Sequence, residues 1–244
     1  MKKVILSVTA IMAFGVASAQ KVKFAAKTGI NISSIKASTS NGDSKSLVGF
    51  HIGGLAEIKL NDKMSLQPEL LYSAEGGKYS FAENIEGTPI TYNQEIKLSK
   101  MNLPISFKYY IIERLSIEAG PQLEYILSAK SESVLNAPTE GVIIANNTDL
   151  SNDSSIVTFN GFPDVSYQDY GLKKLNFSFN LGSGYELPMG VFFQARYSLG
   201  LTKFVDNANF MAGKDADGDQ IIDNRYDNTS FKSSNFQLSV GYKF

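Results

Sequence analysis

The sequence has 244 residues, a formal net charge of −1 at pH 7 and no cysteine. The near-zero charge gives no electrostatic reason to expect a nucleic-acid partner, and the lack of Cys excludes disulfides and thiolate metal sites. Trp is absent, whereas 12 Tyr and 16 Phe are present. This composition suits a protein whose aromatic side chains lie at a lipid–water boundary, although other β-rich proteins share it.

The amino-terminal segment, residues 1–19, predicts a secretory signal peptide. Two lysines precede an apolar run over residues 4–16, and small residues follow up to Ala19. The run is shorter than the ~20 apolar residues that span a bilayer, which favours export over a membrane anchor. A buried amino-terminal helix is the less favoured alternative. We expect cleavage between Ala19 and Gln20, and one domain over residues 20–244.

Eight stretches alternate apolar with polar or small residues, as a β-strand with one apolar face does. The last stretch ends on Phe244, with Tyr242 two residues earlier. Bacterial outer-membrane barrels typically end in this way, so these two aromatics are the expected assembly signal. In chain order the predicted strands are 22–32, 48–60, 64–73, 101–109, 115–127, 174–185, 191–201 and 236–244.

The connections between these strands alternate between long and short. Tight turns are predicted at 61–63, 113–114 and 187–190, and longer polar connections at 37–45, 76–95, 131–170 and 205–230. Eight strands with both termini on one side need this order, with short turns in the periplasm and longer loops outside. We therefore predict an all-β fold, an eight-stranded antiparallel transmembrane up-and-down β-barrel in the cell outer membrane.

Other architectures stay open. A soluble sandwich would not require the strict alternation of connections, and a ten-stranded barrel is compatible with the sequence. The longest connection contains two apolar pieces, 142–145 and 156–159. They fit either a hairpin that continues beyond the membrane or an extra strand pair.

Charged residues of both signs recur at inward positions of the predicted strands. Buried charges must be paired or hydrated, and eight strands leave an interior that side chains fill. We therefore predict a salt-bridged, hydrated plug, with a narrow channel as the alternative. The predicted barrel-interior polar network consists of Glu57, Lys59, Glu69, Lys108, Glu118, Glu124, Lys174 and Arg196. Outward aromatics should form a periplasmic girdle of Tyr109, Tyr185, Phe193, Tyr242 and Phe244, and an outer girdle of Tyr72, Tyr125 and Phe204.

His51 is the only histidine and lies at an inward position of the second predicted strand. One His without Cys cannot form a His/Cys metal cluster. A lipid-modifying enzyme would need a nucleophile, a base and an orienting group in contact, and no motif identifies such a set. We therefore favour a hydrogen-bonded interior histidine and a protein that is not an enzyme.

The last long connection contains an acidic repeat from Asp215 to Asp223. Carboxylates at its first, third, fifth and ninth positions, with a main-chain carbonyl at the seventh, suit Ca²⁺. The pattern resembles thrombospondin type 3 and EF-hand-like loops, but Tyr226 stands where a bidentate acid is expected. Calcium is the candidate ligand, and a solvated acidic loop is the alternative. The proposed ligands are Asp215, Asp217, Asp219, Ile221 (through its carbonyl) and Asp223.

Several short motifs together resemble the PorT-like outer-membrane β-barrel family. They are Lys27-Thr-Gly-Ile-Asn31, Val48-Gly-Phe-His-Ile-Gly53, Leu66-Gln-Pro-Glu-Leu-Leu-Tyr72, Leu103-Pro-Ile-Ser-Phe-Lys108, Ala119-Gly-Pro-Gln-Leu123 and Gly241-Tyr-Lys-Phe244. The resemblance implies an eight-stranded outer-membrane barrel without catalytic residues. One member is tied to a secretion and gliding apparatus, whereas most have no assigned activity. The expected partners are outer-membrane lipid, the barrel-assembly machinery and an unidentified ligand at the outer loops.

Overall fold

The computed structural model describes residues 22–37, 43–85, 88–137, 142–150, 154–157, 165–168, 172–205, 211–214, 220–222 and 231–244. The long strands are β1 (Val22–Ala37), β2 (Asp43–Lys59), β3 (Met64–Ile85), β4 (Thr88–Ile112), β5 (Leu115–Ala137), β9 (Leu175–Glu186), β10 (Val191–Gly200) and β13 (Phe231–Lys243). The short strands are β6 (Val142–Asp149), β7 (Ser154–Val157), β8 (Val165–Gln168), β11 (Met211–Lys214) and β12 (Gln220–Ile222). Within these ranges, no helix is long and apolar enough to cross a membrane.

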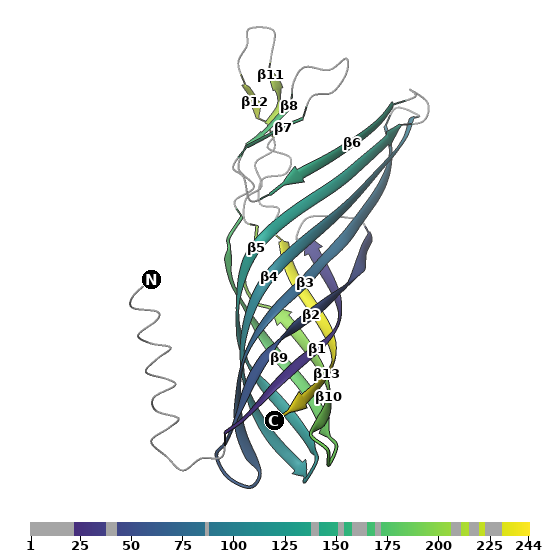
Figure 1. The fold of residues 1–244 in the computed structure, drawn as a ribbon. Helices are drawn as coiled ribbons and strands as arrows, with labels where there is room; N and C mark the ends of the chain where they lie inside the picture. Colours follow the sequence, from purple (N-terminus) through teal and green to yellow (C-terminus); the bar gives the residue numbers. More distant parts are fainter. Residues whose placement is uncertain are drawn as a thin grey trace, which may run out of the picture.

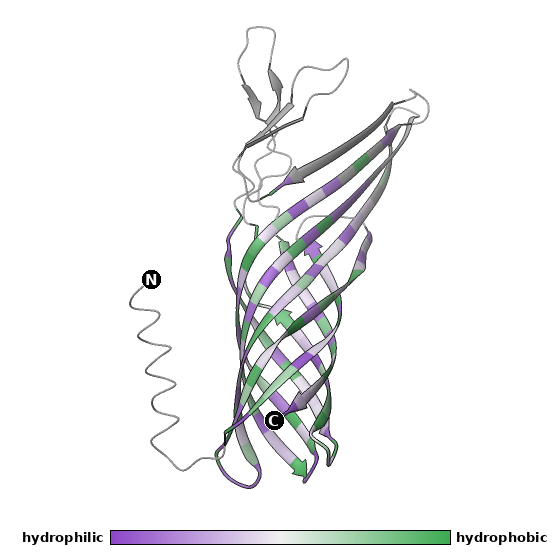
Figure 2. Cartoon of the chain, in the orientation of Figure 1, coloured by the Kyte–Doolittle hydropathy of each residue, from purple (hydrophilic) through white to green (hydrophobic). Residues whose placement is uncertain are grey.

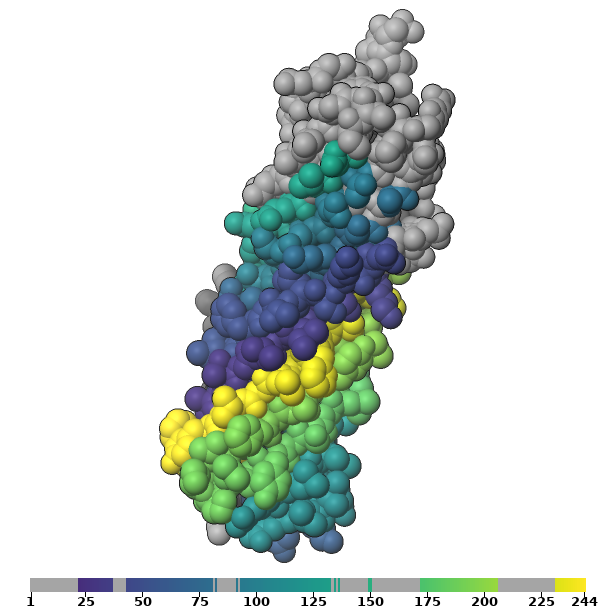
Figure 3. All heavy atoms as spheres, turned by 90° about the vertical axis from the view of Figure 1, so that its right-hand side faces the viewer, coloured from purple at the N-terminus to yellow at the C-terminus, as the bar shows by residue number. Residues whose placement is uncertain are grey.

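The eight long strands form a closed antiparallel ring in the order β1-β2-β3-β4-β5-β9-β10-β13. The ring closes between β13 and β1, from Ala25 opposite Lys243 to Ala37 opposite Phe231. Figure 3 shows β1, β13 and β10 as adjacent oblique bands in purple, yellow and green. Closure gives every strand two neighbours, so the ring has no open edge. The predicted eight-stranded antiparallel up-and-down barrel is confirmed.

The two faces of the barrel wall have opposite polarity. On β9 the side chains of Phe177 and Leu181 are 49% and 57% exposed, whereas Ser178 and Asn180 between them are buried. Figure 2 shows the corresponding alternation of hydrophobic and hydrophilic residues along the strands. A polar inside and an apolar outside reverse the pattern of a soluble protein, because hydrocarbon surrounds the wall.

Three tight turns lie at one end of the barrel, where β1 begins and β13 ends (Figure 1). They connect β2 to β3, β4 to β5 and β9 to β10. The last turn is closed by hydrogen bonding from Leu187 N–H to Val191 C=O at 2.7 Å, and Gly190 adopts φ +88°, which glycine allows. Short turns mark the periplasmic end of an outer-membrane barrel, and we assign this end accordingly.

The prediction of a polar connection over residues 76–95 is wrong. There β3 and β4 continue as one hairpin without a register shift, and their last pair is Ile85 opposite Thr88. The alternation continues in this part of the sequence, as at Tyr79 and Phe81, but its sense is reversed. On the adjoining part of β4, Ile96 and Leu98 are buried on the inner face, whereas Lys97 between them is exposed. A search for strands whose apolar residues face outward therefore ends β3 too early and begins β4 too late.

The connection over residues 131–170 contains both of the structures considered for it. Strand β5 continues to Ala137 and pairs with β6, which includes the apolar piece 142–145. The second piece begins in β7, which pairs with β8 in a separate two-stranded sheet. Figure 1 shows β3, β4, β5 and β6 rising together on one side, beyond the tops of the other barrel strands.

Candidate functional site in the barrel interior

The interior of the barrel holds equal numbers of opposite charges. Among the described residues, five cations and five carboxylates are buried, each at most 7% exposed. Their charges cancel, which allows them to lie inside the wall without a net charge to hydrate. The cations are Lys27, Lys100, Lys108, Arg196 and Lys243, and the carboxylates are Glu57, Glu69, Glu75, Glu118 and Glu124.

The central cluster is built around Arg196 of β10. Its guanidinium donates from Nε to Glu118 Oε1 at 2.8 Å and from Nη1 to Glu69 Oε2 at 3.0 Å. Lys27 Nζ lies 2.6 Å from the same oxygen of Glu69. These four side chains come from β10, β5, β3 and β1, so the cluster connects opposite sides of the ring.

A second cluster surrounds Lys100 of β4, nearer the outer end. Its ammonium donates to Glu75 Oε2 and Glu124 Oε2, both at 2.9 Å, and to Ser233 Oγ at 3.0 Å. All three ammonium protons therefore have an acceptor. The partners belong to β3, β5 and β13, so this cluster also crosses the lumen.

The third cluster lies at the periplasmic end around Glu57 of β2. Lys243 Nζ approaches Glu57 Oε2 at 2.6 Å, whereas Lys108 Nζ lies 3.4 Å from the same atom. The Tyr110 hydroxyl donates a short hydrogen bond to the other oxygen of Glu57. Lys243 also pairs with Glu186 of β9. The three clusters divide the lumen along its length.

Above the Lys100 cluster the interior becomes apolar. Ile96 and Leu98 of β4 and Ile126 of β5 pack with residues from the outer connections, including Phe204 and Val205. The expectation that Phe204 belongs to an outer aromatic girdle is wrong, because its side chain is only 2% exposed. The buried members of this outer apolar cluster are Ile35, Ile96, Leu98, Ile126, Ala129, Leu150, Phe204 and Val205. It covers the polar lumen at its outer end.

The structure brings six of the eight predicted network residues into the buried clusters. The other two, Lys59 and Lys174, are exposed. Lys59 is the last residue of β2 and Lys174 precedes β9, so both lie where the wall ends and their ammonium groups reach water. Their assignment to the interior network was wrong. An inward position on a strand therefore predicts a buried side chain only where the strand lies within the barrel wall.

Four buried charges, Lys27, Glu75, Lys100 and Lys243, are not among the predicted network residues. Lys27 and Lys243 already alternate with apolar residues, so their inward direction was visible in the sequence. Glu75 and Lys100 lie outside the predicted strands, which ended too early on β3 and began too late on β4. The period of two continues through Glu75 and through Lys100, and it could have identified both as inward residues. The polar connection predicted between them obscured this.

His51 holds three strands together. Its Nδ1 and Nε2 lie 2.8 Å from Asn31 Oδ1 and Ser239 Oγ, respectively. The Asn31 amide nitrogen donates elsewhere, to Ser73 Oγ among others, so its oxygen accepts from Nδ1–H and Nε2 accepts the Ser239 proton. The arrangement of Ser239, His51 and Asn31 resembles that of a nucleophile, a base and an orienting group in an enzyme. However, His51 and Asn31 have no exposed surface and Ser239 is 6% exposed, so a substrate could not reach the hydroxyl oxygen without rearrangement of the wall.

Other predicted site residues lie partly outside the described ranges. Ala19 and Gln20 of the cleavage site, and Asp215, Asp217, Asp219 and Asp223 of the acidic repeat, all lie outside them. Ile221 lies in β12, of which only the backbone is described. In the part of the chain that is described, no group of three His, Asp or Glu side chains could hold a metal ion. Tyr242 and Phe244 face outward, 48% and 77% exposed, with their rings 5.5 Å apart.

The chain was compared with solved structures, curated sequences and family models. Among solved structures, the chain is similar to Ail, the attachment invasion locus protein of Yersinia pestis (11% identity, 92% of this chain and 99% of that chain, TM-score 0.42). It is also similar to Neisserial surface protein A (12%, 92% and 99%, 0.43) and to OprG from Pseudomonas aeruginosa (12%, 92% and 97%, 0.42). No curated protein sequence matches the chain. The model of the outer membrane protein beta-barrel domain matches residues 18–206, and the chain therefore belongs to this family of outer-membrane barrels.

Proposed function

We propose that this outer-membrane barrel is a non-enzymatic scaffold that presents a binding surface outside the cell. The observation that carries the proposal is the unequal length of its strands. Strands β3, β4 and β5 have 22, 25 and 23 residues, whereas β9 and β10 have 12 and 10. About 9–11 residues of a tilted strand cross the bilayer. Roughly half of each long strand therefore extends beyond the membrane, a length that spanning the bilayer does not require.

The outward charges of this extended sheet support its position in water. Lys78 of β3 lies 2.9 Å from Glu95 of β4, and Lys97 of β4 lies 2.8 Å from Glu132 of β5. The hydrogen bond from Lys78 holds the pKa of the Glu95 carboxyl below its usual range. Charges on the outer surface of a barrel are costly in hydrocarbon. These ion pairs therefore lie above the apolar belt of the barrel. The sheet, together with connections 131–170 and 205–230, would form the binding surface.

The arrangement of the interior supports a scaffold more than a pore. Three ion clusters cross the lumen, and the outer apolar cluster covers it. A narrow channel for small solutes is the second candidate, favoured by the polar inner wall. The resemblance to PorT-like proteins would add a place in a secretion and gliding apparatus. Calcium at the acidic repeat and recognition of Tyr242 and Phe244 by the barrel-assembly machinery belong to the same proposal.

Shortening the β3–β4 hairpin would test the binding role. Tyr79 and Gln94 lie opposite each other, so a two-residue turn between them removes the outer part and keeps the barrel strands. We expect the shortened protein to fold but to lose partners that co-purify with the full chain from crosslinked outer membranes. Unchanged co-purification would contradict a role for the sheet. Planar-bilayer recordings on both proteins should show no stepwise conductance, and conductance by the full chain would favour the channel.

Replacement of His51 by Ala would test the non-enzymatic assignment. The variant loses hydrogen bonds to Asn31 and Ser239, so we expect a loss of stability of about 1–3 kcal/mol, measured by urea unfolding in lipid vesicles. The lipid composition of the outer membrane should stay unchanged. A lipid change in cells that carry H51A, but not in cells that carry the equally buried Ser73→Ala variant, would support a hydrolase instead.

A further inference from the structure

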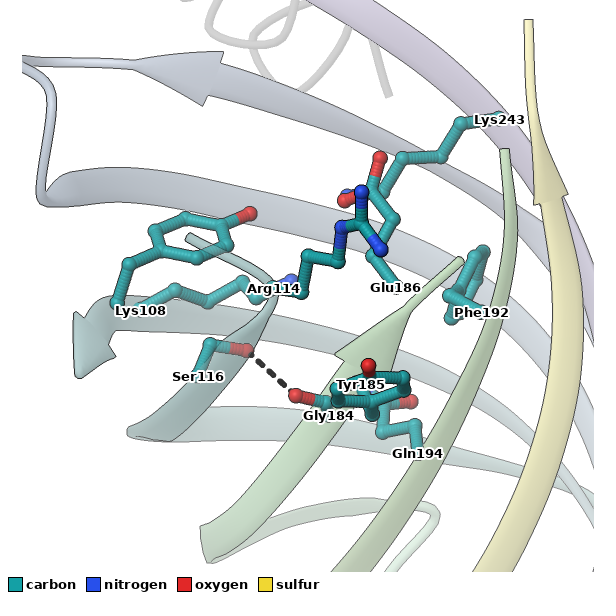
Figure 4. A pocket seen from close by; sticks show the side chains of 10 residues that line it. Lys108, Arg114, Ser116, Gly184, Tyr185, Glu186, Phe192, Gln194 and Lys243 are labelled. Carbon is teal, nitrogen blue, oxygen red and sulfur yellow. Dashed lines mark hydrogen bonds and ion pairs between the residues drawn. The ribbon is translucent and has the colours of Figure 1, made fainter. Parts of the chain in front are cut away.

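A small pocket opens at the periplasmic end of the barrel, inside the ring of tight turns. Its lining comes from β4, β5, β9, β10 and β13 and from the turn after β4. Figure 4 shows Lys108, Arg114 and Lys243 pointing into this space from different sides, with Glu186 between them. The lining therefore contains three cations and one carboxylate.

Two of these cations have bonding capacity to spare. Lys108 is 6% exposed, yet its only ion pair among the described residues is the 3.4 Å contact with Glu57. An ammonium group has three donors, and the shared oxygen of Glu57 is held more closely by Lys243, at 2.6 Å. The guanidinium of Arg114 is exposed and makes no hydrogen bond or ion pair with any residue that the structure describes. The pocket thus has more donors than acceptors.

The space in the pocket depends on Gly184 of β9. A Cβ atom built at this position would meet only Ser116 Oγ at 3.4 Å and the Phe193 carbonyl oxygen at 3.5 Å, which are ordinary contact distances. By contrast, a Cβ on Gly182, the preceding inward residue of β9, would lie 2.7 Å from the Ala195 carbonyl oxygen. The lack of a side chain at Gly184 is therefore not required by backbone packing, and it leaves the hollow beside Ser116 open.

We infer that this pocket binds a small oxyanion, the carboxylate or phosphate group of a periplasmic molecule. A guanidinium fork and an ammonium group are the donors that recognise such groups by charge-assisted hydrogen bonds. The Ser116 hydroxyl, which donates to Gly184 C=O at 3.3 Å, can turn to add a third donor. The hollow has room for about one water molecule, so one oxygen of the anion enters it. The rest of the charged group lies at its mouth, beside Arg114, and the remainder of the molecule stays in the periplasm. This site is independent of the binding surface proposed for the outer end.

The inference can be tested by NMR on the full chain in detergent micelles. Inorganic phosphate and acetate are titrated separately at constant ionic strength, with chloride as the balancing anion. Saturable shifts of the Arg114, Ser116 and Gly184 amide signals are expected with at least one of the two anions. A response to phosphate alone identifies a phosphate group, a response to acetate alone a carboxylate, and a response to both a general oxyanion site.

Three variants make the test specific. Arg114→Gln, at an exposed position that folding does not need, should weaken binding at least about tenfold. Gly184→Val fills the hollow without removing a charge and should have a similar effect. Lys63→Gln removes an exposed cation from the neighbouring β2–β3 turn and should leave binding unchanged. The inference is overturned if neither anion binds the unaltered protein, or if K63Q and R114Q weaken binding equally.

Discussion

Replacing Arg196 with Met should destabilise the folded barrel by about 3–5 kcal/mol, the cost of breaking a buried ion pair by removing one partner. The guanidinium is fully buried between Glu69 and Glu118. Lys27 would still pair with Glu69, but Glu118 would keep only the Gln194 amide at 2.8 Å. An uncompensated carboxylate would then lie inside the wall. Urea unfolding in lipid vesicles, followed by tyrosine fluorescence, would measure the loss.

A compensating variant separates charge from packing. Arg196→Met combined with Glu118→Gln removes one cation and one carboxylate, and Glu69 keeps its pair with Lys27. This double variant should regain most of the lost stability, because replacement of a whole buried ion pair is often nearly neutral. If the double variant were as unstable as R196M, packing of the guanidinium rather than its charge would be the cause. A loss below about 1 kcal/mol for R196M would contradict the proposed importance of the central cluster.

Replacing Leu181 with Arg should cost about 2–4 kcal/mol, the value for a cation on the lipid face near the bilayer midplane. Leu181 lies in the middle of β9 and is 57% exposed on the outer surface. In water such a position would tolerate Arg, whereas in hydrocarbon the charge must be hydrated or moved to the interface. The same unfolding assay in vesicles would measure the difference.

The matched control is Met189→Arg in the turn between β9 and β10, where the side chain is 67% exposed. The turn lies outside the hydrocarbon, so this change should alter stability by less than about 1 kcal/mol. Equal effects of L181R and M189R would mean that the outer surface of β9 does not face lipid. Little loss from L181R in the presence of bound lipid would contradict the assigned membrane position.

Where the wall crosses the membrane, local pattern was enough to predict the fold. Along β9, Phe177 and Leu181 face hydrocarbon and Ser178 faces the interior, so apolar and polar residues alternate in the sequence itself. The same rule identified Arg196 and Glu118 as inward residues. Lys59 also alternates correctly, but it is exposed because the wall ends there. A period of two gives the direction of a side chain but not the height at which the barrel stops.

Non-local pairing decided the rest. Lys27 and Gln194 are separated by 167 positions in the chain yet lie 2.6 Å apart, because ring closure and strand register bring β1 and β10 to the same level. Outside the bilayer, β3 and β4 stay paired up to Ile85 opposite Thr88. There the apolar residues turn to the inner face, and Ile96 and Leu98 join Phe204 in the outer apolar cluster. Because each strand that crosses the bilayer has lipid on one face and the polar interior on the other, its sequence alternates between apolar and polar residues. The partners of the interior charges, and the structure above the membrane, depend on contacts between segments far apart in the chain, which no local pattern contains.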